Sequence, residues 1–277
     1  MQNIPTEKGM IRKAFIPPFG KKLIVADYSQ LEMRVGGFLA KKRIGWSKVQ
    51  EAYMNSAAAD LHEATRAQME GLGVAKFFHS DPLCRRNAKV VNFGFFYGRS
   101  AAAFAQDNDV DRNEAADLRH KFLNDLYPEI QAMQKYCAGQ LVAKGYVTTI
   151  TGRRRRYPEE QGKSFQDVWW PAWQGWNATV QGSAQDIIQI AMRNLYEGIM
   201  KNREDGLEFE GKKVPALAWE EVKVLIQVHD ELVAEAPEEH VETVARWMGH
   251  VMSTAVVDDD MAFPADPTTG DSWEEAK

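Results

Sequence analysis

The chain has 277 residues and a formal net charge of −5, and 44% of its residues are hydrophobic, which is enough for one large domain or two modest ones. No apolar run approaches the roughly 18 residues that a membrane-spanning helix needs, and the N-terminal stretch has no apolar core of the signal-peptide kind. The two cysteines, Cys84 and Cys137, are too few and too far apart for a disulfide framework or a zinc site. We therefore expect a protein of a reducing, cytoplasmic environment with no membrane contact.

The distribution of charge says more than the net value, which alone argues weakly against a nucleic-acid partner. Acidic residues gather at Asp258–Asp260 and Glu274–Glu275, whereas basic residues cluster at Lys41–Arg43, at Arg85, Arg86 and Lys89, and at Arg153–Arg156. A locally basic surface on an acidic protein can still bind a polyanion. Any single charge run can instead be an ordinary solvated face, and for Lys41–Arg43 this alternative is equally good.

The N-terminal half is predicted to hold one strand followed by a block of helices. Lys22–Asp27 is a short apolar run typical of a buried strand, and it leads into a helix over about Gln30–Ala40. The helical pattern then continues to about Lys144. Within it, Asp111 is the expected N-cap of a helix that runs to about residue 126, and Pro128 is expected to open the next helix.

The C-terminal half is predicted to be mixed. We first expect a hairpin over Tyr146–Tyr157 around Thr151-Gly152, and then a long helix over about Phe165–Met200. A loop or weak hairpin over Lys201–Trp219 should follow. The remainder should hold strands over Val222–Val228 and Leu232–Ala236, a helix over about Glu238–Ser253, and an irregular tail. His229-Asp230-Glu231 would lie at the turn between the two strands. Strands therefore sit at the two ends of the sequence, which predicts one sheet built from both ends and interrupted by a helical insertion.

Three segments carry a resemblance to a known family. They are DYSQLEMR at Asp27–Arg34, RRNAKVVNFGFFYG at Arg85–Gly98, and HDE at His229–Glu231. In order, spacing and chemistry they resemble motifs A, B and C of the family A DNA polymerases, the group of bacterial DNA polymerase I and many phage enzymes. The resemblance implies a mostly helical α+β fold, in which a palm with an antiparallel sheet (residues 1–32 and 166–277) is interrupted by helical fingers (residues 33–165).

The first and third segments offer carboxylates at the ends of predicted strands. Taken alone, Asp27 or Asp230 would usually be a turn residue making a local hydrogen bond. The resemblance instead implies that both bind two magnesium ions, hard cations that prefer oxygen ligands, together with the backbone carbonyl of Tyr28. It also implies a weaker catalytic role for Glu231 and a place for His229 facing the primer terminus.

The second segment predicts a helix with a stripe of side chains four residues apart. Arg85 and Lys89 make the N-terminal part of this stripe cationic, and Phe93 and Tyr97 make the C-terminal part aromatic. Triphosphate oxygens suit Arg and Lys, and a base or sugar suits an aromatic face. The alternative is an amphipathic helix with its aromatic residues in a core, which we prefer for Phe95 and Phe96.

The resemblance implies further nucleotide contacts and the choice of sugar. Glu32 matches a residue that blocks the space for a ribose 2′-hydroxyl, and Phe93 implies discrimination against dideoxynucleotides. Gln30 and His62 match positions near the incoming phosphates. His62-Glu63 is not the start of a zinc-protease HExxH motif, because position 66 is Arg66.

Contacts with DNA are also implied. Asn177 and Gln181 match the helix that touches the template and the minor groove, where the acceptor pattern is nearly independent of sequence. Arg153 and Arg154 match contacts to the template backbone; a nuclear localisation signal is the less favoured interpretation of this run. The sequence departs from the family at two positions implied to contact the primer-template: Trp173 falls where the bacterial enzymes carry an Arg, and Glu7 replaces a residue that is often basic. Trp169, Trp173 and Trp176 share a helical face, which predicts core packing.

The sequence therefore predicts a template-directed DNA polymerase that adds dNMP from a dNTP to a primer 3′-hydroxyl with two Mg²⁺ ions, in a bacterial cell or a phage-infected host. Parts that precede QNIP in the family, namely the thumb, the first palm strands and any proofreading domain, are not in the sequence. We expect either a fragment or one half of a split polymerase whose thumb and exonuclease are on a separate chain. One alternative is a non-catalytic or partner-dependent subunit that binds DNA. Another is a single-subunit RNA polymerase, against which Glu32 and the HDE form argue.

Overall fold

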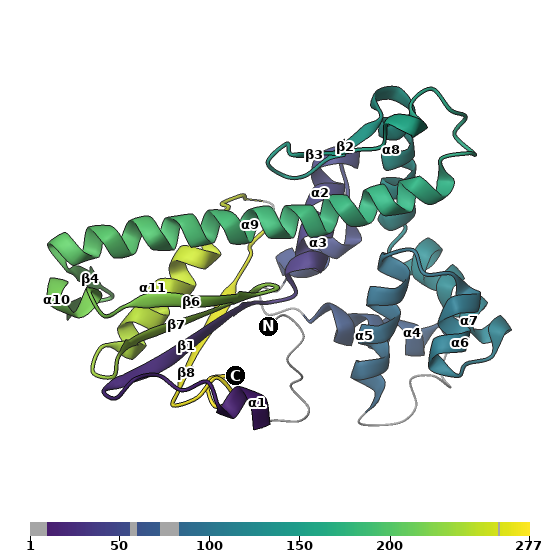
Figure 1. The fold of residues 1–277 in the computed structure, drawn as a ribbon. Coiled ribbons are helices and arrows are strands. Elements are labelled where there is room, and N and C mark those ends of the chain that lie inside the picture. The colour runs from purple at the N-terminus through teal and green to yellow at the C-terminus, as the bar shows by residue number, and fades with distance from the viewer. Residues whose placement is uncertain (1–9, 56–59, 73–82, 260) are drawn as a thin grey trace. The chain divides into compact units, whose positions relative to one another are not determined.

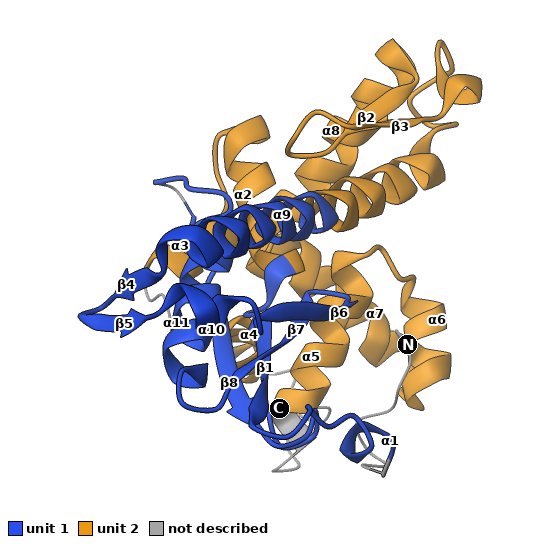
Figure 2. Cartoon of the chain, turned by 60° about the vertical axis from the view of Figure 1, so that its left-hand side comes forward, with its two compact units in different colours: residues 1–31, 184–277 blue, residues 32–183 orange. Residues whose placement is uncertain are grey.

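The computed structural model describes residues 10–55, 60–72, 83–259 and 261–277 (Figure 1). Glu7, one of the predicted departures from the family, lies outside these ranges. The chain divides into two compact units, residues 1–31 with 184–277 and residues 32–183 (Figure 2). The assignment of residues 1–32 and 166–277 to a palm and of 33–165 to fingers stays a prediction. Within the described ranges, no helix is long and apolar enough to cross a membrane.

The first unit contains a four-stranded antiparallel sheet in the order β6-β7-β1-β8. Its strands are β1 (Lys21–Tyr28), β6 (Lys223–Val228), β7 (Glu231–Pro237) and β8 (Ala265–Gly270). The apolar run of β1 is buried because the strand is central, with β7 on one side and β8 on the other. The prediction of a mostly helical α+β fold, with one sheet built from both ends of the chain, is confirmed.

The prediction of an irregular tail was wrong, because β8 pairs with β1 along the segment ADPTTG. This segment has no alternation of apolar and polar residues and contains Pro267, so its sequence gives no strand signal. Proline is tolerated because β8 is an edge strand, where one side of the ladder needs no donor. Pairing with the apolar strand β1 overrides the weak local preference.

Helices cover the sheet of the first unit. Helix α11 (Val241–Ser253) packs against β1 and β8 (Figure 1), and a Cβ atom on its Gly249 would lie 2.8 Å from Pro267, so only glycine allows this approach. The predicted weak segment Lys201–Trp219 begins with the end of α9 (Trp169–Asp205), continues as a hairpin of β4 (Leu207–Phe209) and β5 (Lys212–Val214), and ends in α10 (Ala216–Trp219). A short helix, α1 (Met10–Lys13), precedes β1.

The second unit is helical. It contains α2 (Leu31–Ile44, from Glu32 on), α3 (Lys48–Asn55), α4 (Leu61–Gly71), α5 (Leu83–Phe96), α6 (Ala101–Asn108), α7 (Arg112–Lys121), the π-helical turn η2 (Phe122–Leu126), α8 (Glu129–Lys144), the 3-10 turn η3 (Pro158–Glu160) and the first part of α9. The predicted hairpin is present as β2 (Tyr146–Thr148) and β3 (Arg154–Arg156). Asp111 caps α7 as predicted, since its side chain accepts from the N–H groups of Asn113 and Glu114.

The core of the second unit is rich in aromatic side chains. Phe95 and Phe96 are buried, as predicted, and Phe96 packs 5.3 Å from Trp176 between ring centroids. Trp173 and Trp176 are also buried, but Trp169 is 44% exposed, so the prediction for Trp169 was wrong. The shared face of α9 is covered only from Ala172 onward, and Trp169 is the first residue of the helix.

Candidate active site

The sheet of the first unit brings two candidate metal ligands to the same end of its two central strands, β1 and β7, and this end is the edge at which the site lies. Asp27 is paired with Glu231 at the end of β1, and the N–H of Tyr28 donates to the backbone oxygen of Asp230 at 3.2 Å. The tight turn between β6 and β7 is made possible by His229, which has a left-handed φ of 53°. The backbone therefore fixes Asp27, Tyr28 and Asp230 beside one another, as the resemblance implies.

The two carboxylates sit in different surroundings. The side chain of Asp27 is about half exposed, and Lys277 Nζ lies 3.8 Å from its Oδ2. Burial raises the pKa of Asp230, and the negative charge of Glu231 acts in the same direction, while His229 and Lys277 oppose the shift. A cation bound at Asp230 would therefore offset the cost of its buried charge.

Tyr28 is anchored by its side chain. Its hydroxyl donates to the backbone oxygen of Met252 in α11 at 2.7 Å, and burial raises the pKa of this phenol. The phenol is thus committed to the packing between β1 and α11. Only the backbone of Tyr28 remains at the edge of the sheet, which agrees with a role limited to its carbonyl oxygen.

Glu231 is held by groups from distant parts of the chain. Trp273 Nε1 donates to its Oε1 at 2.7 Å, Lys277 donates to its Oε2, and an Arg12 nitrogen lies 3.9 Å from Oε1. The Glu231 side chain is almost fully buried. Both oxygens therefore have protein partners, and this carboxylate supports the site rather than offering a vacant ligand.

The donor chemistry at this edge fits magnesium. Magnesium in phosphoryl-transfer sites is held by one or two carboxylates, with phosphate oxygens and water completing the shell. Asp27 and Asp230 supply two carboxylates and Tyr28 a carbonyl. Within the part of the chain that the structure describes, no group of three or more His, Cys, Asp or Glu side chains could hold a metal by itself.

In the second unit, α5 carries the predicted cationic and aromatic stripe. Lys89 Nζ lies 5.9 Å from the centre of the Phe93 ring, and the rings of Phe93 and Tyr97 stack with centroids 6.4 Å apart at 23°. Tyr97 follows the last residue of α5, but its N–H still donates to the oxygen of Phe93 at 3.3 Å, so the stripe continues by one turn. Arg85 and Lys89 are exposed and both rings are half-buried, so a ligand can reach all four.

Glu32 and Asn177 both contact Tyr97. The Tyr97 hydroxyl donates to Oε2 of Glu32, and Nδ2 of Asn177 donates to the Tyr97 backbone oxygen at 3.2 Å. Gly98, with a φ of 82°, ends the helical turn, and a Cβ atom there would clash with the Trp173 ring. The hydroxyl and the backbone oxygen of Tyr97 are therefore both held by hydrogen bonds, and the close packing at Gly98 fixes the backbone after it. Two of these contacts come from residues predicted to bind substrate.

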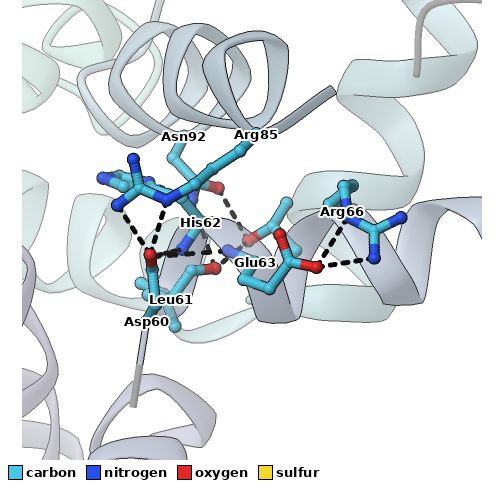
Figure 3. A network of polar contacts seen from close by, with 8 residues as sticks. Asp60, Leu61, His62, Glu63, Arg66, Arg85 and Asn92 are labelled. Atoms are coloured by element: carbon cyan, nitrogen blue, oxygen red, sulfur yellow. Dashed lines mark hydrogen bonds and ion pairs between the residues drawn. The ribbon is translucent and has the colours of Figure 1, made fainter. Parts of the chain in front are cut away.

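A polar network joins α4 to α5 beside the cationic end of the stripe (Figure 3). Asp60 Oδ1 caps α4 by accepting from the N–H groups of His62 and Glu63, and its Oδ2 accepts from Arg85 Nε and ion-pairs with Arg85, both at 2.6 Å. Burial would raise the pKa of Asp60, but hydrogen bonds and the charge of Arg85 lower it overall. Asp60 thus stays charged and positions Arg85.

His62 is buried next to this pair. Burial and the cations Arg85 and Lys89 lower its pKa to about 4, against the opposing effect of Asp60, so the imidazole is neutral at neutral pH. Its ring lies 5.6 Å from that of Phe93. His62 therefore lies beside Phe93 and close to the charges of Arg85 and Lys89.

Sequence reasoning missed Asp60 and Asn92. Asp60 could have been found, because Asp60-Leu-His-Glu63 has the form of a capping box at the start of a helix. Asn92 is fully buried and contacts His62. Its only sequence signal is an amide directly before Phe93, which does not reveal a partner 30 residues away.

The predicted DNA contacts in the second unit lie on α9 and the β2–β3 hairpin. Gln181 is exposed on α9, whereas Arg153 reaches α9 by donating to the Gly182 oxygen at 2.9 Å. Arg154 stacks over Tyr146 with its guanidinium carbon 4.7 Å from the ring centre. The four arginines of the run are exposed. A Cβ atom at Gly182 would lie 2.8 Å from Thr149, so this glycine allows the close contact between hairpin and helix.

Gln30 and His229 lie in the first unit, each with a left-handed φ near 50°. The backbone oxygen of His229 accepts from Gln227 Nε2 at 2.6 Å, and the residue is exposed at the turn. The first unit therefore holds Asp27, Tyr28, Gln30, His229, Asp230 and Glu231, and the second holds the remaining candidates.

A strand-edge pair of carboxylates and a helix with a cationic and aromatic stripe are together typical of nucleic-acid polymerases. A profile of DNA polymerase family A matches residues 1–275, and the chain belongs to this family. Curated relatives include DNA polymerase I of Bacillus subtilis (strain 168), 34% identical over 281 residues, and the thermostable DNA polymerase I of Thermus filiformis, 33% identical over 282 residues. Each covers the whole chain, which spans only 29% and 30% of their respective lengths.

A solved structure gives the same answer. The POL domain of Pol1 from M. smegmatis, in complex with DNA primer-template and dNTP, is 28% identical to the chain and matches it with a TM-score of 0.79. The match covers all of this chain and 45% of that one. The predicted family is thus confirmed by sequence and by fold.

Proposed function

We propose that the chain catalyses template-directed DNA synthesis, in which a dNMP is transferred from a dNTP to a primer 3′-hydroxyl with release of pyrophosphate. The observation that carries this proposal is the hydrogen bond from the Tyr28 N–H to the Asp230 backbone oxygen, which joins the two segments that carry the candidate carboxylates. Family membership supports the reaction class.

Asp27, Asp230 and the Tyr28 carbonyl would hold two magnesium ions together with the triphosphate. Bound magnesium lowers the pKa of the attacking hydroxyl and neutralises charge that develops on the phosphates. Glu231 would hold Lys277 and Arg12 close to this edge and keep the end of β1 in place. His229, exposed at the turn, would face the primer terminus.

The stripe on α5 would bind the dNTP along its length. Arg85 and Lys89 would bind phosphate oxygens, since their charges are exposed and Arg85 is oriented by Asp60. Phe93 would pack on the deoxyribose, and Tyr97 would stack at the position of the templating base. Glu32, held by the Tyr97 hydroxyl, would fill the space of a 2′-hydroxyl. Gln30 would add a contact near the phosphates.

Primer-template DNA would be bound by Arg153, Arg154, Asn177 and Gln181. Arg153 and Arg154 would contact the backbone of the template, and the two amides would contact the minor groove. A thumb, whether in the same polypeptide or on a separate chain that also carries an exonuclease, would complete the grip on duplex DNA.

The test is primer extension by the chain alone with dNTPs and magnesium, compared with Asp230→Asn. We expect the variant to lose extension by about a hundredfold or more, the scale seen when a group that stabilises transition-state charge is removed. Asp271→Asn is the matched control, because Asp271 is an exposed aspartate of the same unit that pairs with Lys22 at 3.2 Å. Equal extension by wild type and Asp230→Asn would refute the assignment of the metal site.

A second candidate function is that of a partner-dependent subunit that binds DNA. It is supported by apolar side chains before β1 that lie in solvent, Ile16 at 68% and Phe19 fully exposed. DNA binding without extension by the chain alone, and extension once a thumb-bearing chain is added, would favour this function.

A further inference from the structure

His62 has one ring nitrogen that is engaged by the protein and one that is not. Nδ1 lies 2.8 Å from Nδ2 of Asn92, whereas none of the described residues hydrogen-bonds Nε2. Because the imidazole is neutral at neutral pH, it carries a single proton, on one nitrogen or the other. The partner of Nδ1 therefore decides whether Nε2 is a donor or an acceptor.

The surroundings of Asn92 fix the orientation of its amide. Nδ2 also lies 3.5 Å from the backbone oxygen of Leu61, which can only accept, so the amide nitrogen belongs on this side. On the other side, Oδ1 lies 2.9 Å from the Thr65 hydroxyl, whose single proton is shared between this oxygen and the backbone oxygen of Leu61 at 2.7 Å. The Tyr127 hydroxyl lies 2.9 Å from the Thr65 hydroxyl, and either oxygen can donate to the other. The amide nitrogen therefore donates to Nδ1 of His62.

We infer that Asn92 is a positioning residue that holds His62 in the tautomer with its proton on Nε2, so that the ring presents an N–H donor to an oxygen of a nucleoside triphosphate. This inference rests on the proposed function for the identity of the acceptor. The opposite tautomer would present a lone pair to an anionic oxygen and repel it.

The charged groups around the ring agree with an anionic ligand. The positive charges of Arg85 and Lys89, both on α5, act on the ring. Asp60, the nearby carboxylate, already accepts from Arg85 and from the N–H groups of α4 (Figure 3). The His62 residue is buried and Nε2 has no hydrogen-bond partner among the described residues, so Nε2–H favours an acceptor that reaches it. A phosphate oxygen held by Arg85 and Lys89 would be such an acceptor.

The experiment measures the tautomer directly by ¹⁵N NMR of the whole chain with labelled histidine, since protonated and unprotonated ring nitrogens have distinct shifts. His62 is assigned with His62→Gln. We expect wild-type His62 to carry its proton on Nε2, and Asn92→Asp to place a proton on Nδ1, because a carboxylate accepts where the amide donated. Thr65→Val, which removes the donor to Oδ1, should give a mixture of tautomers.

The chain offers a matched control on its surface. Asn124 Nδ2 lies 3.2 Å from His120 Nδ1, the same pair of atoms in an exposed position. Asn124→Asp should leave His62 unchanged. A proton on Nδ1 of His62 in the wild type, or no change of tautomer in Asn92→Asp and Thr65→Val, would overturn the inference.

Ligand binding separates the inference from the proposed function. Titration with labelled dATP and magnesium should show that Asn92→Leu binds about tenfold more weakly, the effect of losing one hydrogen bond to a charged group. The loss should disappear in a His62→Gln background, and Asn124→Leu should bind as wild type. An equal loss in both backgrounds would overturn the inference. If wild type binds no dATP while the tautomers behave as expected, the proposed function fails and the positioning role of Asn92 stands.

Discussion

At the residue scale, the candidate site depends on side chains that orient other side chains. Glu32 is fixed by Tyr97, and Arg85 is fixed by Asp60. Glu231 is held by Trp273, Lys277 and Arg12, which all lie far from it in sequence. The motif residues were predictable because their types and spacing repeat a known pattern. Their supports were not, since a partner brought together by tertiary folding leaves no local pattern.

The contact between Glu32 and Tyr97 leads to a prediction about sugar choice. Glu32→Ala removes the carboxylate proposed to exclude a 2′-hydroxyl. Incorporation of rNTP relative to dNTP should therefore rise about tenfold or more, which is the size of effect expected when a pocket can no longer reject one extra group on its substrate. Tyr97→Phe should produce part of this effect, because Glu32 then loses its anchor. Single-nucleotide incorporation with dATP and ATP measures both ratios.

The double variant tests whether Glu32 and Tyr97 act together. The effects of Glu32→Ala and Tyr97→Phe should not add, because each substitution removes the same hydrogen bond between the two side chains. An unchanged ratio of rNTP to dNTP incorporation in Glu32→Ala would exclude Glu32 as the determinant of sugar choice.

At the element scale, Glu129 fastens the start of α3 to the start of α8. Its Oε1 accepts from the N–H of Val49 at 2.8 Å and from the Ser47 hydroxyl at 3.1 Å, and Ser47 in turn accepts from the N–H of Gln50. These are the unpaired N–H groups of a helix N-terminus, which a carboxylate stabilises. Burial raises the pKa of Glu129 even though these hydrogen bonds and Lys48 oppose the shift.

The raised pKa of Glu129 predicts a pH dependence of stability. Because the folded state holds this proton more tightly than the unfolded chain, Glu129 stabilises the fold fully below the ordinary glutamate pKa of 4.5, and this contribution is lost as pH rises through the higher folded pKa. Glu129→Gln keeps an acceptor but has no charge, so its stability relative to wild type should improve between pH 4 and pH 7. Urea unfolding at several pH values measures the difference.

Glu129→Ala tests the hydrogen bonds separately from the charge. It leaves the N–H of Val49 without an acceptor, which should lower the free energy of unfolding by about 1–3 kcal/mol. A difference between Glu129→Gln and wild type that does not change with pH would contradict the role of the buried charge.

Local signals predicted most elements, and tertiary contacts decided the rest. The Asp111 cap, the Tyr146–Tyr157 hairpin and the strand pair around HDE follow from residues within a few positions of one another. β8 could not be predicted, because its ladder with β1 joins residues more than 230 positions apart. Trp169 was placed in a core by helical spacing, which cannot reveal where the covering elements begin.

At the scale of the whole molecule, charge is unevenly distributed between surfaces. The chain has a net charge of −5, but Arg153–Arg156 form an exposed basic run on the β2–β3 hairpin. Arg153 and Arg154 are partly ordered by Gly182 and Tyr146, which lowers the entropy lost when they bind a ligand. The composition alone did not indicate a polyanion partner, whereas the position of this run does.

This distribution predicts how binding of primer-template DNA depends on salt. Each phosphate contact contributes about 0.9 to the slope of log K against log salt concentration, so Arg153→Ala with Arg154→Ala should reduce the slope by about 1.8. Lys212→Ala with Lys213→Ala is the matched control, because it removes two exposed cations from the β4–β5 hairpin of the other unit and should leave the slope unchanged. Fluorescence anisotropy of labelled DNA at several salt concentrations gives each slope. If the arginine run contacts phosphates directly, the slope should fall in the arginine double variant and not in the lysine double variant. An equal fall in both would mean that binding responds to net charge alone and would contradict the assigned contacts.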